Sequence, residues 1–97
     1  MREKAVEDKI KHTLSLLGKN VWFFKHAASA SMKKGIPDII ACINGKFVGI
    51  EVKQANGRQS DEQKVCEKNI RDAGGEYWLV FSYEQFMQKL TTYIKGD

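Results

Sequence analysis

The chain has 97 residues, 42% of them hydrophobic and 10% aromatic, and a formal net charge of +4. This length leaves no room for a second hydrophobic core, so we expect one domain over residues 1–97. No apolar run is long enough to span a membrane and no signal-peptide core is visible, which predicts a soluble, cytoplasmic protein. The basic charge is compatible with a polyanionic partner without requiring one.

The first part of the chain predicts a helix, a strand and a loop. Apolar residues recur at helical spacing over residues 3–17, and Gly18 ends the pattern. Residues 21–24 form an aromatic and β-branched run that is typical of a strand. Residues 26–35 are small and polar with a basic end, which indicates an exposed loop.

Two apolar runs, residues 38–43 and 46–53, predict a pair of strands joined by Asn44 and Gly45. A type I′ turn needs positive φ at both central residues, and Asn-Gly is the dipeptide that best tolerates this. The sequence therefore predicts a tight β-hairpin in the middle of the chain.

The remaining elements follow in the order helix, strand, helix. Ser60 and Gln63 have the spacing of a capping box at the start of a helix that runs to residues 74–75. Residues 77–81 are continuously apolar, as in a strand that is buried on both faces, and Ser82 caps a last helix. The order α-β-β-β-α-β-α predicts an α/β fold with a mixed sheet flanked by helices.

The cysteines and tryptophans have apolar neighbours and are predicted to be core residues. Cys42 and Cys66 are expected to be reduced, since a disulfide has no support in their spacing. The two histidines and two cysteines show no ligand spacing for zinc. Trp22 and Trp78 are predicted to pack inside rather than to stack on bases.

The hairpin register places two carboxylates opposite each other. With Asn-Gly in the turn, counting outward pairs Asp38 with Glu51, whose Cβ atoms would be roughly 4.5–5.5 Å apart. Lys53 shares this face because side chains alternate along a strand. At about 5 Å and an effective dielectric near 20, the repulsion is on the order of 3 kcal/mol. A shared proton, a cation or Lys53 must offset it.

A hard divalent cation fits such a pair, because Mg²⁺ prefers carboxylate oxygens and keeps several waters. The ion would polarise a phosphate and give a water nucleophile near neutral pH, while Lys53 holds that water or neutralises developing charge. Gly49, on the same face, is predicted to leave space for substrate. Solvated strand acids are the common alternative, but residues 35–37 and the hairpin register favour a hydrolytic site.

Several further residues allow either a functional or a purely structural interpretation. Glu7 either joins the site from the first helix or pairs with Lys11 one turn on, and the ion pair is the simpler prediction. Gln63 either contacts metal-bound water or substrate, or only caps its helix, and the cap explains it fully. The lysines that either contact nucleic-acid phosphates or are ordinary solvated charges are Lys25, Lys33 and Lys34.

At this point Pro37-Asp38 followed by Glu51-Val52-Lys53 resembles the PD-(D/E)xK nuclease signature. Residues 34–38 and 49–53, together with Ser60-x-x-Gln63, resemble more narrowly the VRR-NUC domain, over nearly the whole chain. The paired arginines that give this domain its name are not evident, and residues near Ile36 offer lysines instead.

The resemblance implies a restriction-endonuclease-like fold and a structure-selective endonuclease that cuts branched DNA such as junctions or flaps. It implies a homodimer similar to virus-encoded stand-alone domains, which act in the host cytoplasm. By the same resemblance Lys53 would position the attacking water, and Glu7 and Gln63 would support the site. The ligands implied for Mg²⁺ or Mn²⁺ are Asp38, Glu51 and the Val52 carbonyl.

Two alternatives remain open. A catalytically silent nucleic-acid-binding module of the same fold would bind DNA in a salt-sensitive way without cleaving it. A nuclease subunit could instead need a partner for activity. The intact acids and lysine favour the nuclease, since a silent module has no reason to retain mutually repelling carboxylates.

Overall fold

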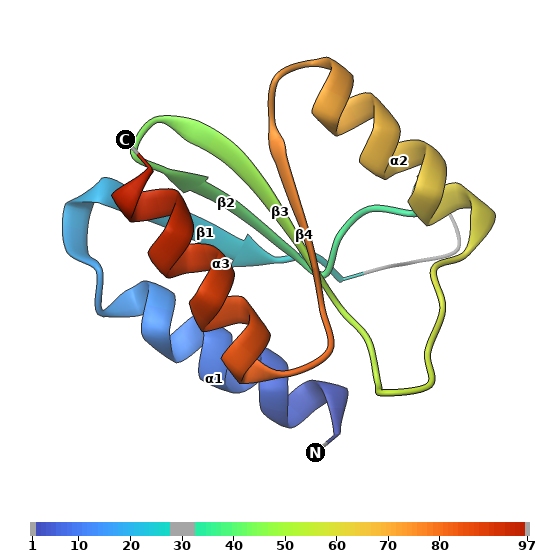
Figure 1. Ribbon diagram of the computed structural model, residues 1–97, viewed down its shortest axis with the longest axis horizontal. Coiled ribbons are helices and arrows are strands. Elements are labelled where there is room, and N and C mark those ends of the chain that lie inside the picture. The colour runs from blue at the N-terminus through green and yellow to red at the C-terminus, as the bar shows by residue number, and fades with distance from the viewer. Residues whose placement is uncertain (1, 28–32, 97) are drawn as a thin grey trace.

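The computed structural model describes residues 2–27 and 33–96, in which a four-stranded sheet lies between helices (Figure 1). The order of helices and strands is the predicted one, with a short 3-10 turn added before the first strand. The elements are α1 (Glu3–Ser15), the 3-10 turn (Gly18–Asn20), β1 (Val21–Lys25), β2 (Ile39–Ile43), β3 (Lys46–Val52), α2 (Asp61–Asp72), β4 (Glu76–Val80) and α3 (Tyr83–Lys95).

The sheet has the strand order β1-β2-β3-β4 and is mixed. The first two pairings are antiparallel, whereas β3 and β4 run parallel and are connected through α2. The predicted hairpin is confirmed, because Ile43 pairs with Lys46 and the φ angles of Asn44 and Gly45 are 54° and 82°. Its ladder continues to the pair of Ile39 and Ile50, so the register is also the predicted one.

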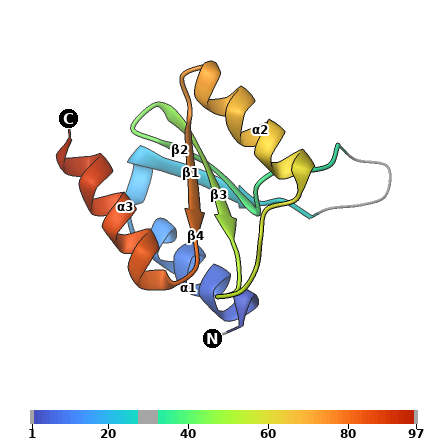
Figure 2. The same ribbon diagram turned by 45° about the vertical axis from the view of Figure 1, so that its right-hand side comes forward.

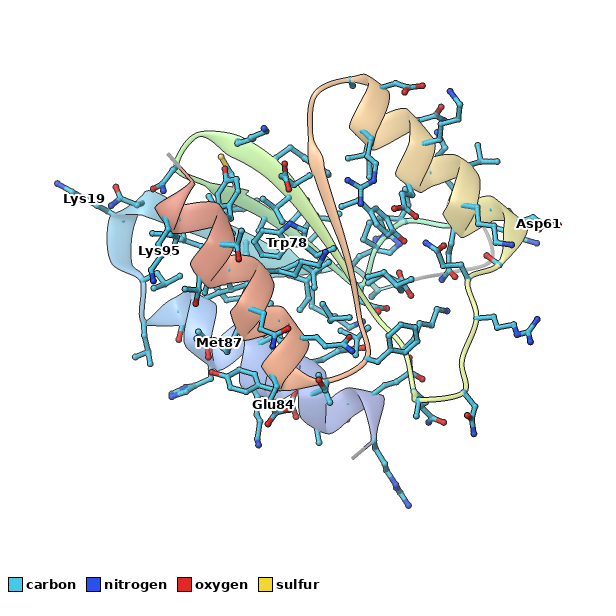
Figure 3. All side chains as sticks on the ribbon, viewed as in Figure 1. Lys19, Asp61, Trp78, Glu84, Met87 and Lys95 are labelled. Atoms are coloured by element: carbon cyan, nitrogen blue, oxygen red, sulfur yellow. The ribbon has the colours of Figure 1, made fainter. Side chains whose placement is uncertain are left out.

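The hydrophobic core lies between one face of the sheet and the helices α1 and α3, which pack side by side (Figures 1 and 2). Trp78, predicted to be internal, is 3% exposed and lies between α3 and the sheet (Figure 3). Alternate residues of β3 point into this core, as predicted. The core residues are Val6, Ile10, Leu14, Ile39, Ala41, Ile43, Val48, Ile50, Val52, Trp78, Val80, Phe86 and Leu90.

The second face of the sheet is covered only in part. Helix α2 packs over β3 and β4 on the side opposite α3, where Ile70 lies against Gly49 (Figure 2). On β1 and β2 this face is open, and Trp22 is 65% exposed. The predictions that Trp22 and Cys42 are core residues are therefore wrong, because both point to the uncovered face; Cys66 on α2 is half-buried.

No helix in the described part of the chain is long and apolar enough to cross a lipid bilayer. Residues 28–32 of the predicted basic loop lie outside the described residues. Asp38, Glu51 and Gln63 lie at the ends of β2 and β3 away from the hairpin turn and in the first turn of α2.

Candidate active site

Asp38 lies directly before β2 and is held against the end of β3. Its Oδ2 atom accepts a hydrogen bond of 2.8 Å from the backbone nitrogen of Val52. The last pair of the β2–β3 ladder is Ile39 with Ile50, so the next residue of each strand is Asp38 and Glu51. The two carboxylates thus occupy neighbouring positions at the same end of the sheet.

Glu51 is the one buried charged residue of the described chain, with 2% of its surface exposed. Its Oε2 atom accepts a hydrogen bond of 3.0 Å from Nε2 of Gln63, and Nζ of Lys53 lies 3.5 Å from the same oxygen. Its Oε1 atom is buried and has no hydrogen-bond partner. Leaving such an acceptor unpaired costs about 1–3 kcal/mol, so this oxygen is suited to accept a cation or a hydrogen-bond donor.

The electrostatics of the site act on Glu51 in opposite directions. Burial, and then the negative charge of Asp38, raise the pKa of Glu51 from 4.5 to about 7, whereas Lys53 acts to lower it. The carboxylate of Glu51 therefore carries an electrostatic cost near neutral pH that a cation would relieve.

Helix α1 reaches the site through Glu7 and a bridging lysine. Nζ of Lys25 lies 3.1 Å from Oε1 of Glu7 and 3.6 Å from Oδ1 of Asp38. The predicted ion pair between Glu7 and Lys11 is wrong, since Lys11 pairs with Asp8 at 3.4 Å. Glu7 lies beside the buried stripe of α1 and turns toward β1, while its neighbour Asp8 faces solvent.

Gln63 forms the predicted capping box and also donates a hydrogen bond to a carboxylate of the site. Its Oε1 atom accepts a hydrogen bond of 2.8 Å from the backbone nitrogen of Ser60, and its backbone nitrogen donates to Oγ of Ser60 at 3.1 Å, which completes the predicted capping box. The other end of its amide donates to Glu51. The start of α2 is therefore tied directly to the buried carboxylate.

Two glycines allow close packing around the carboxylates. Gly35, with φ of 87°, lies so close to the backbone of Glu62 that any side chain would collide with α2. A Cβ atom on Gly49 would fall 2.8 Å from Cγ of Pro37. The predicted role of Gly49 in leaving space for substrate is therefore wrong: Pro37 fills that space and supports Asp38.

The three predicted nucleic-acid lysines occupy different places. Lys25 is part of the carboxylate cluster, as described above. Lys33 and Lys34 are exposed and line a pocket of about 410 Å³ beside α2, together with Val65 and Cys66. The structure thus separates one lysine of the site from two lysines at its periphery.

A hydrogen-bond network that the sequence did not reveal fixes the loop between β3 and α2. Nε2 of Gln59 donates to Glu67 at 3.0 Å and to the hydroxyl of Tyr77 at 3.3 Å, and Arg71 donates to the backbone oxygen of Tyr77 at 2.8 Å. These partners belong to different elements, and no local spacing pattern identifies them.

The donor set fits a hard divalent cation. Asp38 and Glu51 supply carboxylate oxygens, which Mg²⁺ and Mn²⁺ prefer, and Oε1 of Glu51 lacks any other partner. Among the residues described, no group of three or more histidine, cysteine, aspartate or glutamate side chains could hold a metal. Further ligands would have to be backbone carbonyls, water or substrate oxygens, as is common for Mg²⁺.

The model of the archaeal Holliday junction resolvase (Hjc) family matches residues 1–91. The chain belongs to this family. The chain is similar to a solved VRR_NUC domain, with 22% sequence identity and a TM-score of 0.78. The alignment covers 94% of this chain and 96% of the solved one. The chain is also similar to a solved VRR_NUC domain protein, with 18% identity and a TM-score of 0.76, over 98% of this chain and 89% of the solved one. A search of curated proteins finds no match.

These similarities confirm the fold and the family type that the sequence indicated. The two solved structures have the same fold, and the mixed four-stranded sheet flanked by helices is of the restriction-endonuclease-like type. Membership of the Hjc family identifies the chain as a nuclease-type domain, and its fold is that of VRR_NUC domains.

Proposed function

We propose that this chain is a Mg²⁺-dependent endonuclease that hydrolyses phosphodiester bonds in branched DNA, such as four-way junctions or flaps. The observation that carries the proposal is the buried Glu51, whose Oε1 atom has no partner although Asp38 and Lys53 are adjacent. The preference for branched DNA follows the name of the family, archaeal Holliday junction resolvase.

In this proposal Asp38, Glu51 and the carbonyl of Val52 hold Mg²⁺ or Mn²⁺. A bound ion of this kind polarises the phosphate under attack and makes a nearby water more acidic. Nζ of Lys53, beside Glu51 and 18% exposed, can hold that water or neutralise negative charge that develops on the phosphate. The water oxygen would form a bond to phosphorus and lose a proton, while the bond from phosphorus to one ester oxygen breaks and that oxygen takes up a proton.

The residues around this centre have supporting roles. Lys25 links Glu7 to Asp38 and thereby positions the Asp38 carboxylate. Gln63 holds one oxygen of Glu51. Lys33 and Lys34, which are exposed beside α2, would contact DNA phosphates and lend the binding its dependence on salt.

The test is an activity panel with purified protein on four-way junctions, flaps, forks and linear duplexes. Cleavage with Mg²⁺ or Mn²⁺ is expected, with none in EDTA. Asp38→Asn and Lys53→Ala should each lower the rate at least 100-fold, as removal of a transition-state contact does. The matched controls, Asp72→Asn and Lys68→Ala, change an exposed ion pair on α2 and should cut as the wild type does.

The outcomes separate the candidate functions. Metal-dependent cleavage that survives Asp38→Asn or Lys53→Ala overturns the assigned roles. Tight DNA binding without cleavage by any divalent ion would instead identify a binding module. Preferential cutting of the linear duplex would remove the proposed selectivity for branches while leaving the chemistry intact.

We further propose a homodimer joined through the open face of the sheet. Trp22, Cys42 and Phe47 lie side by side across β1, β2 and β3, and Phe24 extends this patch with its ring 5.5 Å from that of Trp22. These four side chains are exposed and uncharged, which suits an apolar protein surface better than a phosphate backbone. A second copy presents the same apolar face, and two copies supply the two active sites that symmetric cutting of a junction needs.

The dimer is tested by sizing the protein in solution over a range of concentrations. Trp22→Glu should convert the dimer to a monomer, because it places a charge in the centre of the apolar patch. Leu16→Glu is the matched control, since Leu16 is 70% exposed at the end of α1 and lies outside the patch. A wild-type monomer at micromolar concentration, or equal dissociation by Leu16→Glu, would exclude this interface.

A further inference from the structure

The side-chain amide of Gln63 is held at both of its ends, and the two ends differ in chemistry. Oε1 can only accept a hydrogen bond and accepts one from the Ser60 backbone, whereas Nε2 can only donate and donates to Oε2 of Glu51. Turning the amide by 180° would break both bonds and place Oε1 against the Glu51 carboxylate. The contact with Ser60 therefore fixes which end of the amide faces the site.

The orientation of this amide decides which oxygen of Glu51 is available to a ligand. Oε2 receives the Gln63 donor at 3.0 Å and lies 3.5 Å from Nζ of Lys53. Oε1 is equally buried but has no partner. With Oε2 occupied by two nitrogen donors, Oε1 is the oxygen left for a cation.

Ser60 is well placed to act through Gln63 and not on the site itself. Ser60 is exposed and takes no part in the carboxylate cluster, yet its backbone nitrogen and its Oγ atom each form a hydrogen bond with Gln63, at 2.8 and 3.1 Å. Its backbone oxygen also accepts a bond of 3.1 Å from the nitrogen of Lys64. These bonds fix the first turn of α2, and the bond from Gln63 to Glu51 ties that turn to β3.

We infer that Ser60 is a positioning residue for the metal site: by holding Oε1 of Gln63 it directs Nε2 of Gln63 to Oε2 of Glu51 and reserves Oε1 of Glu51 for the divalent cation. This inference rests on the proposed function, because it concerns the ion that the nuclease would use. The helix cap would then orient a side chain of the metal site in addition to stabilising α2.

The chain contains its own control for this idea. Helix α3 begins with the same Ser-x-x-Gln spacing, and Oγ of Ser82 accepts a hydrogen bond of 3.1 Å from the backbone nitrogen of Gln85. There the amide oxygen of Gln85 accepts a bond of 2.8 Å from the Phe81 backbone, away from the carboxylates. Ser82→Ala therefore removes an equivalent cap without touching the site.

The experiment measures the affinity for Mn²⁺ in the absence of DNA, by calorimetry, for the wild type and four variants. Ser60→Pro removes the backbone donor and the hydroxyl, at a φ of −71° that proline adopts. Its Mn²⁺ affinity should fall about tenfold, the lower end of the effect seen when a group that orients a metal ligand is lost. Ser60→Ala should show a smaller loss, and Ser60→Thr and Ser82→Ala should retain wild-type affinity.

A second readout follows the amide itself. In the wild type and in Ser60→Thr, the side-chain NH₂ NMR signals of Gln63 should lie away from those of a free glutamine and exchange slowly with water, since one proton is hydrogen-bonded to a carboxylate. In Ser60→Pro these signals should move toward those of a free glutamine. Neither change is expected if Ser60 only stabilises the helix.

The outcomes distinguish this inference from the proposed function. Wild-type Mn²⁺ affinity in Ser60→Pro, or a loss no greater than that in Ser82→Ala, overturns the inference. Should Ser60→Pro not fold, the Gln63 NH₂ signals of the wild type decide, because Ser60→Ala keeps the backbone donor; signals like those of a free glutamine overturn the inference. Failure of the wild type to bind Mn²⁺ contradicts both proposals, whereas the NMR signals then still report whether Ser60 orients the amide.

Discussion

The substitution Glu51→Gln should stabilise the protein in the absence of a divalent cation. Glu51 is 2% exposed, and burial together with Asp38 raises its pKa from 4.5 to about 7. This difference corresponds to about 3 kcal/mol of lost stability once the carboxylate is fully ionised in the folded state. The pKa of about 7 already includes the opposing effect of Lys53, so the expected gain at pH 8 is about 3 kcal/mol.

The gain should depend on pH in a defined direction. Below pH 4.5 Glu51 is protonated in both the folded and the unfolded chain, so it imposes no cost. As the pH rises from 4.5 through 7, the unfolded chain ionises first and the wild type loses stability relative to the variant. Above pH 7 the difference is constant.

The assay is urea unfolding of both proteins at pH 5 and pH 8 in EDTA. Glu84→Gln is the control, because Glu84 is exposed on α3 (Figure 3) and its replacement should change stability by less than about 0.5 kcal/mol. A variant that is no more stable than the wild type at pH 8, or equally stabilised at both pH values, would refute the idea that the ionised Glu51 carboxylate destabilises the fold.

Three further predictions follow from the same contacts. Mg²⁺ at 100 times its Kd should stabilise the wild type by about 2.7 kcal/mol in thermal unfolding, and this effect should vanish in Asp38→Asn. The double substitution of Lys33 and Lys34 by alanine should lower the slope of log affinity against log salt by about 1.8 if both contact phosphates; an unchanged slope excludes them. Gly49→Ala should destabilise the fold by about 1–3 kcal/mol, because its Cβ would displace Pro37, and a neutral result would contradict that packing.

The sequence predicted those features that depend on short stretches of chain. The Asn44-Gly45 turn determines the hairpin register, and the register carries Asp38 to the position beside Glu51. The spacing of Ser60 and Gln63 likewise predicted the helix cap that the structure contains. Local patterns sufficed here because the turn and the cap are each made by residues close in sequence. The catalytic and metal-binding roles of the site residues stay predictions.

The features that the sequence did not predict depend on contacts between distant segments. The residues of β1 are apolar on both faces of the strand, but the sequence does not show that only one face is covered. Trp22 was therefore wrongly predicted to be buried. The partner of Glu7 comes from β1 and not from its own helix. Pro37 packs onto Gly49 across the hairpin, which no spacing rule reports.

The close approach of Gly35 to the backbone of Glu62 has a mechanical consequence. Gly35 precedes Asp38 in the loop that enters β2, and Glu62 precedes Gln63 in the first turn of α2. With no gap between these two segments, a shift of α2 must displace the loop as well. The loop that leads to Asp38 and the helix that carries Gln63 would therefore move together, so a force on α2 would also shift the Asp38 carboxylate.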